Sequence, residues 1–207
     1  MTAAFGVIIL LYMLSSASYI GYLCAQRNFL HLIAYGVLMG GFLLHTGVIA
    51  YAYIRLGQIP VQNLHQTLSF AAWALAGVYL LLRYRFHIKI LGAYTAPLAT
   101  LIMIVAFWIP QHKPAEPHTL FNSIWLVSHI VIIFIGEAAL ALAGGAGGLY
   151  LLQERAIKTK NPRFFFKRLP SLEFLDSTGY AFIITGFTLL TIGLITGFIY
   201  AEKVWGT

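Results

Sequence analysis

The chain has 207 residues, of which 60% are hydrophobic and only 9% are charged. Its mean hydropathy is +0.83, and because a soluble domain usually carries about 25% charged residues, this composition excludes an ordinary soluble protein. The formal net charge is +7, and the single cysteine, Cys24, excludes an internal disulfide or a metal site built from several cysteines.

Six apolar segments, each about long enough to cross a bilayer, follow one another along the chain. They span residues 3–23, 30–54, 65–83, 89–109, 121–152 and 179–201. Only helices satisfy their own backbone within lipid at these lengths, so the sequence predicts an all-α, polytopic membrane helical bundle of about six transmembrane helices. We expect residues 1–207 to form a single integral membrane domain. The first segment lacks a basic leading region, which favours a retained helix over a cleaved signal peptide.

Basic residues are concentrated in alternate loops between these segments. Ten of the 13 lysines and arginines fall in the first, third and fifth loops. The positive-inside rule places these loops in the cytoplasm, and therefore both the N-terminus and the C-terminus outside. The same charge predicts affinity for anionic lipid in the surrounding bilayer, and not for nucleic acid.

A short polar stretch, residues 170–176, precedes the last apolar segment. Ser171 is a suitable N-cap, and Glu173 and Asp176 suit the positive end of a helix. The apolar residues between them predict a separate interfacial helix on the cytoplasmic face.

Two histidines lie within predicted membrane spans: His45 in the second and His129 in the fifth. A polar ionisable side chain at membrane depth is costly, so each is a candidate functional residue. The residues leave two interpretations open, a ligand or proton-relay role and a structural hydrogen bond between helices, for example to a serine or threonine. His118, beside the proline-rich outer loop, is a further candidate, although loop histidines are commonly without such a role.

Glu137 is the other costly residue in the fifth span. It follows His129 by eight residues, which is about 12 Å along a helix. The two side chains point within about 80° of each other, so both could line one cavity. The alternative is a protonated carboxyl bonded to a neighbouring group.

No catalytic triad, HExxH motif or phosphate-binding loop can be assembled from the sequence. Imidazoles without nearby acids or thiols suit a metal whose other ligands come from a cofactor. Haem is the obvious example, because it needs only one or two axial histidines and an apolar, aromatic pocket.

Three stretches resemble the CcsA/ResC-type cytochrome c assembly family, which includes HemX-like relatives. They are IPVQNLHQTLSFAAWAL at 59–75, FNSIWLVSHIVIIFIGEAAL at 121–140 and LPSLEFLDSTGYAFIITGFTLLTIGLITGFIYAEKVWG at 169–206. The last is similar to the segment leading into the family's tryptophan-rich motif, Trp-Gly-x-x-Trp-x-Trp-Asp, whose first three positions match Trp205, Gly206 and Thr207. Two positions depart from the family's pattern: Gln66 replaces a glutamate, and Glu137 occupies a position that is often tyrosine.

The resemblance implies a haem-handling membrane protein of cytochrome c biogenesis, which transports or presents non-covalent, b-type haem for covalent attachment to apocytochrome c. It implies His45 and His129 as ligands of the haem iron, with Trp125 and Trp205 as further haem-binding residues. The implied partners are haem, other cytochrome c assembly subunits and apocytochrome c. The implied location is the bacterial cytoplasmic membrane.

The resemblance also leaves alternatives, because the rest of the tryptophan-rich motif and the family's later histidines are not in the chain. One is the front part of a split or truncated assembly protein, so whether the chain is an enzyme or one part of a haem lyase complex stays open. Another is a HemX-like regulator of haem biosynthesis that binds a cytoplasmic partner through the basic loop at 155–168. A less favoured one is a proton-coupled transporter using Glu137 and His45.

Overall fold

The computed structural model describes residues 2–25, 27–86, 89–110, 124–159 and 169–206. Within these ranges all regular structure is helical, and five of the helices are long and apolar enough to cross a membrane. The helices are α1 (Thr2–Ala25), α2 (Asn28–Leu56), α3 (Leu64–Phe86), α4 (Gly92–Trp108), α5 (Ile124–Lys158) and α6 (Leu172–Trp205). The predicted all-α membrane bundle is therefore confirmed, and the chain is an integral membrane protein.

α4 is shorter than its predicted span of 89–109. It has 17 residues, which corresponds to a length of about 26 Å. The hydrocarbon core of a bilayer is about 30 Å thick, so α4 reaches across it only with help from the residues at its ends.

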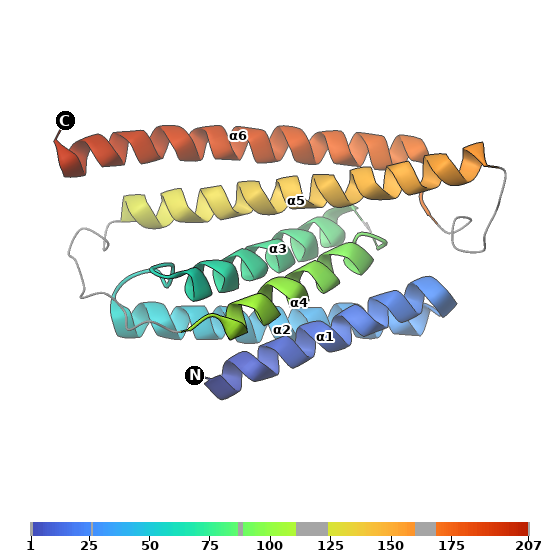
Figure 1. Ribbon diagram of the computed structural model, residues 1–207, viewed down its shortest axis with the longest axis horizontal. Coiled ribbons are helices and arrows are strands. Elements are labelled where there is room, and N and C mark those ends of the chain that lie inside the picture. Colours follow the sequence, from blue (N-terminus) through green and yellow to red (C-terminus); the bar gives the residue numbers. More distant parts are fainter. Residues whose placement is uncertain (1, 26, 87–88, 111–123, 160–168, 207) are drawn as a thin grey trace.

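The helices form layers, with α1 and α2 on one side and α6 on the other (Figure 1). α3 and α4 lie between them, and α3 makes most of the contact with α5. α6 packs along α5 and has no comparable contact with any other described helix. Both ends of the chain lie at the same end of the bundle, as an even number of crossings requires (Figure 1).

Side-chain hydrogen bonds connect the helices of the α1–α4 part. Ser15 Oγ donates to Ala34 O at 2.8 Å, Ser16 Oγ and Thr100 Oγ1 lie 2.9 Å apart, and Tyr79 Oη donates to Tyr19 Oη at 2.9 Å. These groups are buried. In a bilayer, such bonds and close packing hold helices together, because there is no hydrophobic driving force for apolar side chains to move from lipid into a helix–helix contact.

Glycines bring α5 and α6 close together. A Cβ added at Gly186 would lie 2.7 Å from Leu140 Cγ and 2.9 Å from Gly136 O, so the two backbones nearly touch there. Farther along α6, a Cβ added at Gly193 would lie 2.6 Å from Ile133 Cγ1. This pair is therefore held by small residues at the helix–helix contact, a common solution in membranes.

The predicted separate interfacial helix at 170–176 is wrong, because α6 is one continuous helix of 34 residues. Ser171 is its N-cap and accepts a hydrogen bond from the Phe174 backbone N–H at 3.2 Å. Glu173 and Asp176 are exposed. Their polarity therefore does not interrupt the helix, which continues from the polar stretch directly into the apolar one.

The face of α6 that points away from α5 carries large exposed apolar side chains. Phe187 and Phe198 are each 69% exposed, and Leu194 is 60% exposed. Such a stripe is unfavourable in water but suits contact with lipid. The outer side of the α5–α6 pair is therefore a membrane-facing surface.

Candidate functional site

His129 lies near the start of α5, where its ring meets α6. Its Nδ1 is 3.1 Å from Thr196 Oγ1, and that hydroxyl donates its own hydrogen to Gly193 O at 2.8 Å. The Thr196 oxygen must then accept a hydrogen bond from Nδ1–H, which fixes the proton of the neutral imidazole on Nδ1. Nε2 makes no hydrogen bond with any described residue and so keeps a lone pair, the arrangement of a metal-binding histidine whose other nitrogen is held by a neighbour.

Trp125 shares this face of α5 with His129, one helical turn earlier. Its Nε1 donates to the backbone oxygen of Thr196 at 3.1 Å, and 43% of its surface is exposed. Trp125 and His129 are therefore fixed by the same residue of α6, one through the backbone and the other through the side chain. Of the four residues that the resemblance implies for haem binding, His45, His129, Trp125 and Trp205, the structure brings His129 and Trp125 together. Their role in haem binding stays a prediction.

Gly197 provides the space for the His129 ring. A Cβ added at this glycine would lie 2.6 Å from Cε1 of the imidazole, well inside normal contact distance. The small residue at 197 is thus a condition for the Nδ1–Thr196 hydrogen bond.

We expect Gly197→Ala to push the ring out of place and to lower the free energy of unfolding by about 1–3 kcal/mol, the usual cost of overpacking. The matched control is Gly144→Ala on α5, because a Cβ there meets nothing within 4 Å. That substitution should instead be neutral or stabilising by up to about 1 kcal/mol. Thermal unfolding in mild detergent measures both, and equal melting temperatures for the two variants would contradict the packing described.

His45 is in a different environment, buried at the contact of α1, α2 and α3. Only 1% of it is exposed. Its Nδ1 lies 3.3 Å from Tyr12 Oη, and its Nε2 lies 2.9 Å from Ser69 Oγ. Both ring nitrogens therefore have hydrogen-bond partners, which matches the structural interpretation of a bond between helices.

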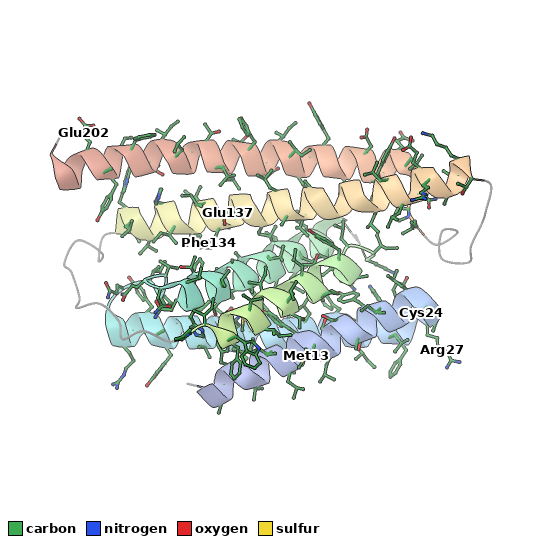
Figure 2. All side chains as sticks on the ribbon, viewed as in Figure 1. Met13, Cys24, Arg27, Phe134, Glu137 and Glu202 are labelled. Carbon is green, nitrogen blue, oxygen red and sulfur yellow. The ribbon has the colours of Figure 1, made fainter. Side chains whose placement is uncertain are left out.

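The structure does not give the two histidines a common partner. The partners of His45 come from α1 and α3, and the partner of His129 comes from α6. The two parts of the bundle meet through Phe70 of α3 and Phe134 of α5, whose ring centroids are 4.9 Å apart. Phe134 lies on the side of α5 that faces α3 (Figure 2).

Glu137 is exposed on the flank of α5, about midway along the bundle (Figure 2). No hydrogen bond or ion pair with another described residue holds it, and it has no contact with His45 or His129. A cavity shared by Glu137 and His129 stays a prediction. His118 lies outside the described residues, and of Trp205 only the backbone, which ends α6, is described.

The two histidines differ in how well they could bind a metal ion or haem iron. Among the described residues, no three histidine, cysteine, aspartate or glutamate side chains come close enough to hold a metal ion. A metal bound at His129 Nε2 would need its remaining ligands from elsewhere, as haem iron obtains four from the porphyrin. His129 fits that role as it stands, whereas His45 would first have to release Ser69 or Tyr12.

Sequence reasoning missed Ser69, Thr196 and Gly197. Ser69 and Thr196 are unremarkable hydroxyl residues in apolar helices, and their partners lie 24 and 67 positions away. One signal was present for Gly197, because Gly186, Gly193 and Gly197 recur at helical spacing and mark one face of the last helix.

Comparison with known proteins gives a consistent result. A family model described as "Cytochrome C assembly protein" matches residues 61–207. The chain is 25% identical over 198 residues to Protein HemX of Brevibacillus brevis, covering 96% of this chain and 73% of that protein. It is 29% identical over 195 residues to the cytochrome c biogenesis protein CcsA of Guillardia theta, and 30% identical over 189 residues to that of Synechococcus sp. (strain CC9902). These two matches cover 84% and 80% of this chain, but only 64% and 62% of the relatives, so the chain spans less than two thirds of their length.

Proposed function

Because the chain belongs to the cytochrome c assembly protein family, we propose that it binds b-type haem non-covalently and presents it for covalent attachment to apocytochrome c. Haem is in this proposal a substrate that is held and passed on. Further assembly subunits and the apocytochrome are the proposed partners. The proposed location is a bacterial cytoplasmic membrane, with the basic loops in the cytoplasm and both chain ends outside.

The observation that carries the proposal is the state of His129. Thr196 fixes the proton on Nδ1 and leaves the Nε2 lone pair without a partner among the described residues. An imidazole held in this way loses little freedom when it binds iron, and its hydrogen-bonded nitrogen makes it a better ligand.

Each neighbouring residue has a defined part in holding the substrate. Trp125 offers an exposed aromatic face beside His129, and Gly197 leaves room for the ring. When bound, haem supplies the group that becomes attached to the thiols of the apocytochrome. Attachment of this kind depends mainly on position and orientation, and a fixed ligand supplies both. Trp205, at the same end of α6, is the proposed further contact.

His45 has a structural part in this proposal. Its two hydrogen bonds hold α1, α2 and α3 together. It could serve as a second axial ligand only after its ring had left Ser69 or Tyr12.

The first test is the visible spectrum of the purified chain in mild detergent, oxidised and then reduced, before and after addition of haem. We expect a Soret band, with α and β bands on reduction, from one haem per chain that acidified butanone extracts completely. Haem that resists extraction would contradict non-covalent binding. A protein that stays colourless after haem is added would contradict the proposal itself.

The match to Protein HemX over 96% of the chain favours a second candidate, a regulator of haem biosynthesis that binds a cytoplasmic partner. The proposed contact is the basic segment at 155–168, which the sequence predicted as a loop; its residues Arg155 and Lys158 instead form the exposed last turn of α5. Removal of residues 160–168 should then abolish co-purification of the partner without changing the melting temperature. Unchanged co-purification would contradict this candidate.

A further inference from the structure

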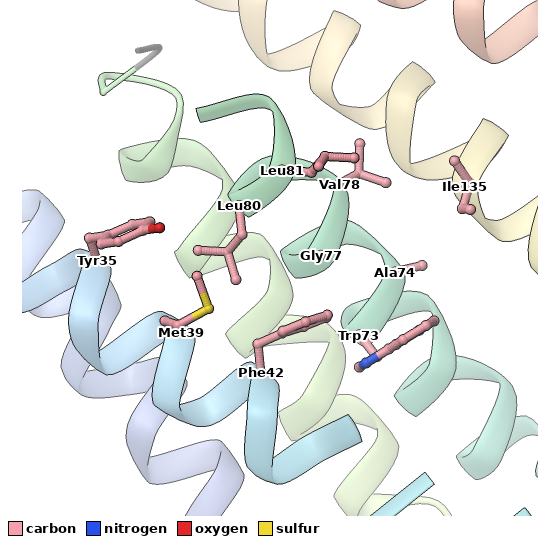
Figure 3. Close-up of a pocket in the computed structure, with 10 residues that line it drawn as sticks. All are labelled: Tyr35, Met39, Phe42, Trp73, Ala74, Gly77, Val78, Leu80, Leu81 and Ile135. Carbon is pink, nitrogen blue, oxygen red and sulfur yellow. The ribbon is translucent and has the colours of Figure 1, made fainter. Parts of the chain in front are cut away.

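A cavity of about 480 Å³ lies between α2, α3 and α5 (Figure 3). This volume is within the range of about 300–1,000 Å³ typical of small-molecule sites. Leu81, at its edge, is 69% exposed, so the cavity opens at the surface of the bundle. Because α2, α3 and α5 are membrane-spanning helices, that surface faces lipid.

The lining of the cavity is apolar and includes three aromatic rings, those of Tyr35, Phe42 and Trp73. Phe42 and Trp73 stack with ring centroids 5.7 Å apart and an interplanar angle of 12°, and both line the cavity. The Trp73 Nε1 donates to Thr46 Oγ1 at 2.8 Å, so the indole's polar atom is already satisfied and its ring face borders the space. Among the described residues, no charged side chain, histidine or cysteine lines the cavity. Such a surface suits a hydrocarbon chain better than haem, because the lining offers no ligand for the iron.

One end of the cavity adjoins a cation. Tyr35 lines the cavity, and the Arg83 guanidinium carbon lies 4.3 Å from the centroid of its ring. Arg83 also donates from Nη1 to Tyr19 Oη at 3.4 Å and interacts with the Tyr79 hydroxyl. The guanidinium has five N–H donors, so most of its hydrogen-bonding capacity remains unused by these contacts.

Arg83 has no carboxylate to neutralise it among the described residues. The first acidic residue of the sequence is Glu116, so α1–α4 contain none. The ion pair found in the described structure joins Lys158 to Glu154, far along the chain. A half-buried guanidinium without a counter-ion is a strong site for phosphate or carboxylate.

A second unsatisfied group lies on the same face of α2. His31 precedes Tyr35 by one helical turn and is only 4% exposed, yet its Nε2 has no hydrogen-bond partner. Its ring is packed against Tyr22 and Tyr19, with centroids 5.2 and 6.5 Å away. The end of the cavity next to Arg83 therefore carries a cation and a buried imidazole nitrogen that has no partner among the described residues.

We propose that this cavity holds an acyl chain of an anionic phospholipid, whose phosphate-bearing headgroup binds Arg83. The order of elements fits: the apolar space borders Tyr35, and Arg83 lies over the same ring at the end of α3. By the positive-inside rule this end is cytoplasmic, where the adjoining leaflet supplies anionic lipid. The site is distinct from His129, and it stands whether or not the chain binds haem.

Native mass spectrometry tests the proposal on the full chain in a neutral detergent, with equal amounts of phosphatidylglycerol and phosphatidylcholine of identical acyl chains. We expect the wild type to retain phosphatidylglycerol preferentially. Arg83→Gln should reduce that preference at least about tenfold, the effect of losing hydrogen bonds to a charged group. The matched control is Arg55→Gln. Arg55 is also near a helix end, and its guanidinium carbon lies 6.0 Å from the ring centroid of Tyr51, but Arg55 does not adjoin the cavity. Arg55→Gln should therefore leave the preference for phosphatidylglycerol unchanged.

The acyl chain is tested separately by Met39→Trp, which fills the cavity and should lower retention of both lipids. If that variant does not fold, bromination of the acyl chains replaces it, because a chain in the cavity should quench the fluorescence of Trp73. Equal retention of the two lipids by the wild type would overturn the headgroup assignment. Absence of quenching would overturn the assignment of the cavity to lipid. So would the finding that the Arg83 and Met39 variants both lose bound haem but retain lipid as the wild type does.

Discussion

Replacement of His129 with alanine is expected to remove most of the haem from the purified protein. The imidazole is the ligand whose free Nε2 is already oriented by the Thr196 hydrogen bond. Removing the hydrogen-bond partner of a metal ligand lowers metal affinity roughly 10–100-fold. Removing the ligand itself should lower haem affinity by more than that. Haem titration followed at the Soret band measures the change, and circular dichroism verifies that the helices remain.

A milder substitution separates the role of His129 as a ligand from a general effect on folding. Thr196→Val keeps the shape of the side chain but removes the acceptor of Nδ1–H, so haem affinity should fall roughly 10–100-fold. Thr191→Val is its control on the same helix, because the exposed Thr191 hydroxyl donates to Phe187 O of its own helix and to no other described residue. Haem affinity that is equal in the Thr191 and Thr196 variants, or unchanged in His129→Ala, would show that iron is bound elsewhere.

Replacement of His45 with alanine should have the largest effect on stability. It leaves the hydroxyls of Tyr12 and Ser69 without their partner and empties the volume of a fully buried ring. We expect the free energy of unfolding to fall by about 2–4 kcal/mol from these two causes together. Unfolding by added SDS in mixed micelles is a suitable measurement.

The role of His45 as a structural residue has its own readout. A double-mutant cycle with Ser69→Ala should give a coupling of about 0.6–1.7 kcal/mol, the range of hydrogen bonds between membrane helices. Haem bound per folded molecule should be unchanged in His45→Ala. If haem is lost while the bundle stays folded, His45 is an iron ligand and its bonds to Tyr12 and Ser69 break on binding.

The order and type of the helices could be predicted from sequence because hydropathy depends on local composition alone. The second helix, expected at 30–54, runs from Asn28 to Leu56, and the third, expected at 65–83, runs from Leu64 to Phe86. The N-cap Ser171 was predicted correctly, but the continuity of α6 from this polar stretch into the apolar one could not be predicted in this way. Exposed Glu173 and Asp176 lower the local hydropathy without breaking the helix, so composition indicated a boundary where the backbone has none.

The candidate site was only partly predictable, for a different reason. The cost of a histidine in lipid marked both His45 and His129, but it does not say which partner relieves that cost. The difference between the two residues comes from Ser69 and Thr196, which the fold brings to them from other helices. Glu137 was marked by the same reasoning, yet its exposure on the flank of α5 depends on how α5 is rotated against α3 and α6, which the sequence pattern does not determine.

The attachment of α6 to α5 alone, among the described helices, has a consequence for how the protein comes apart. Partial opening follows the weakest boundary in a structure, and here that boundary lies between α5 and the α1–α4 part, because α5 packs much more extensively on α6 than on α3 or α4. We expect the α5–α6 pair to separate from α1–α4 as one unit, while α1–α4 stay together through their buried side-chain bonds. Such an opening leaves the hydrogen bond between His129 and Thr196 intact, so the orientation of the proposed haem ligand would survive a movement that parts the two halves of the bundle.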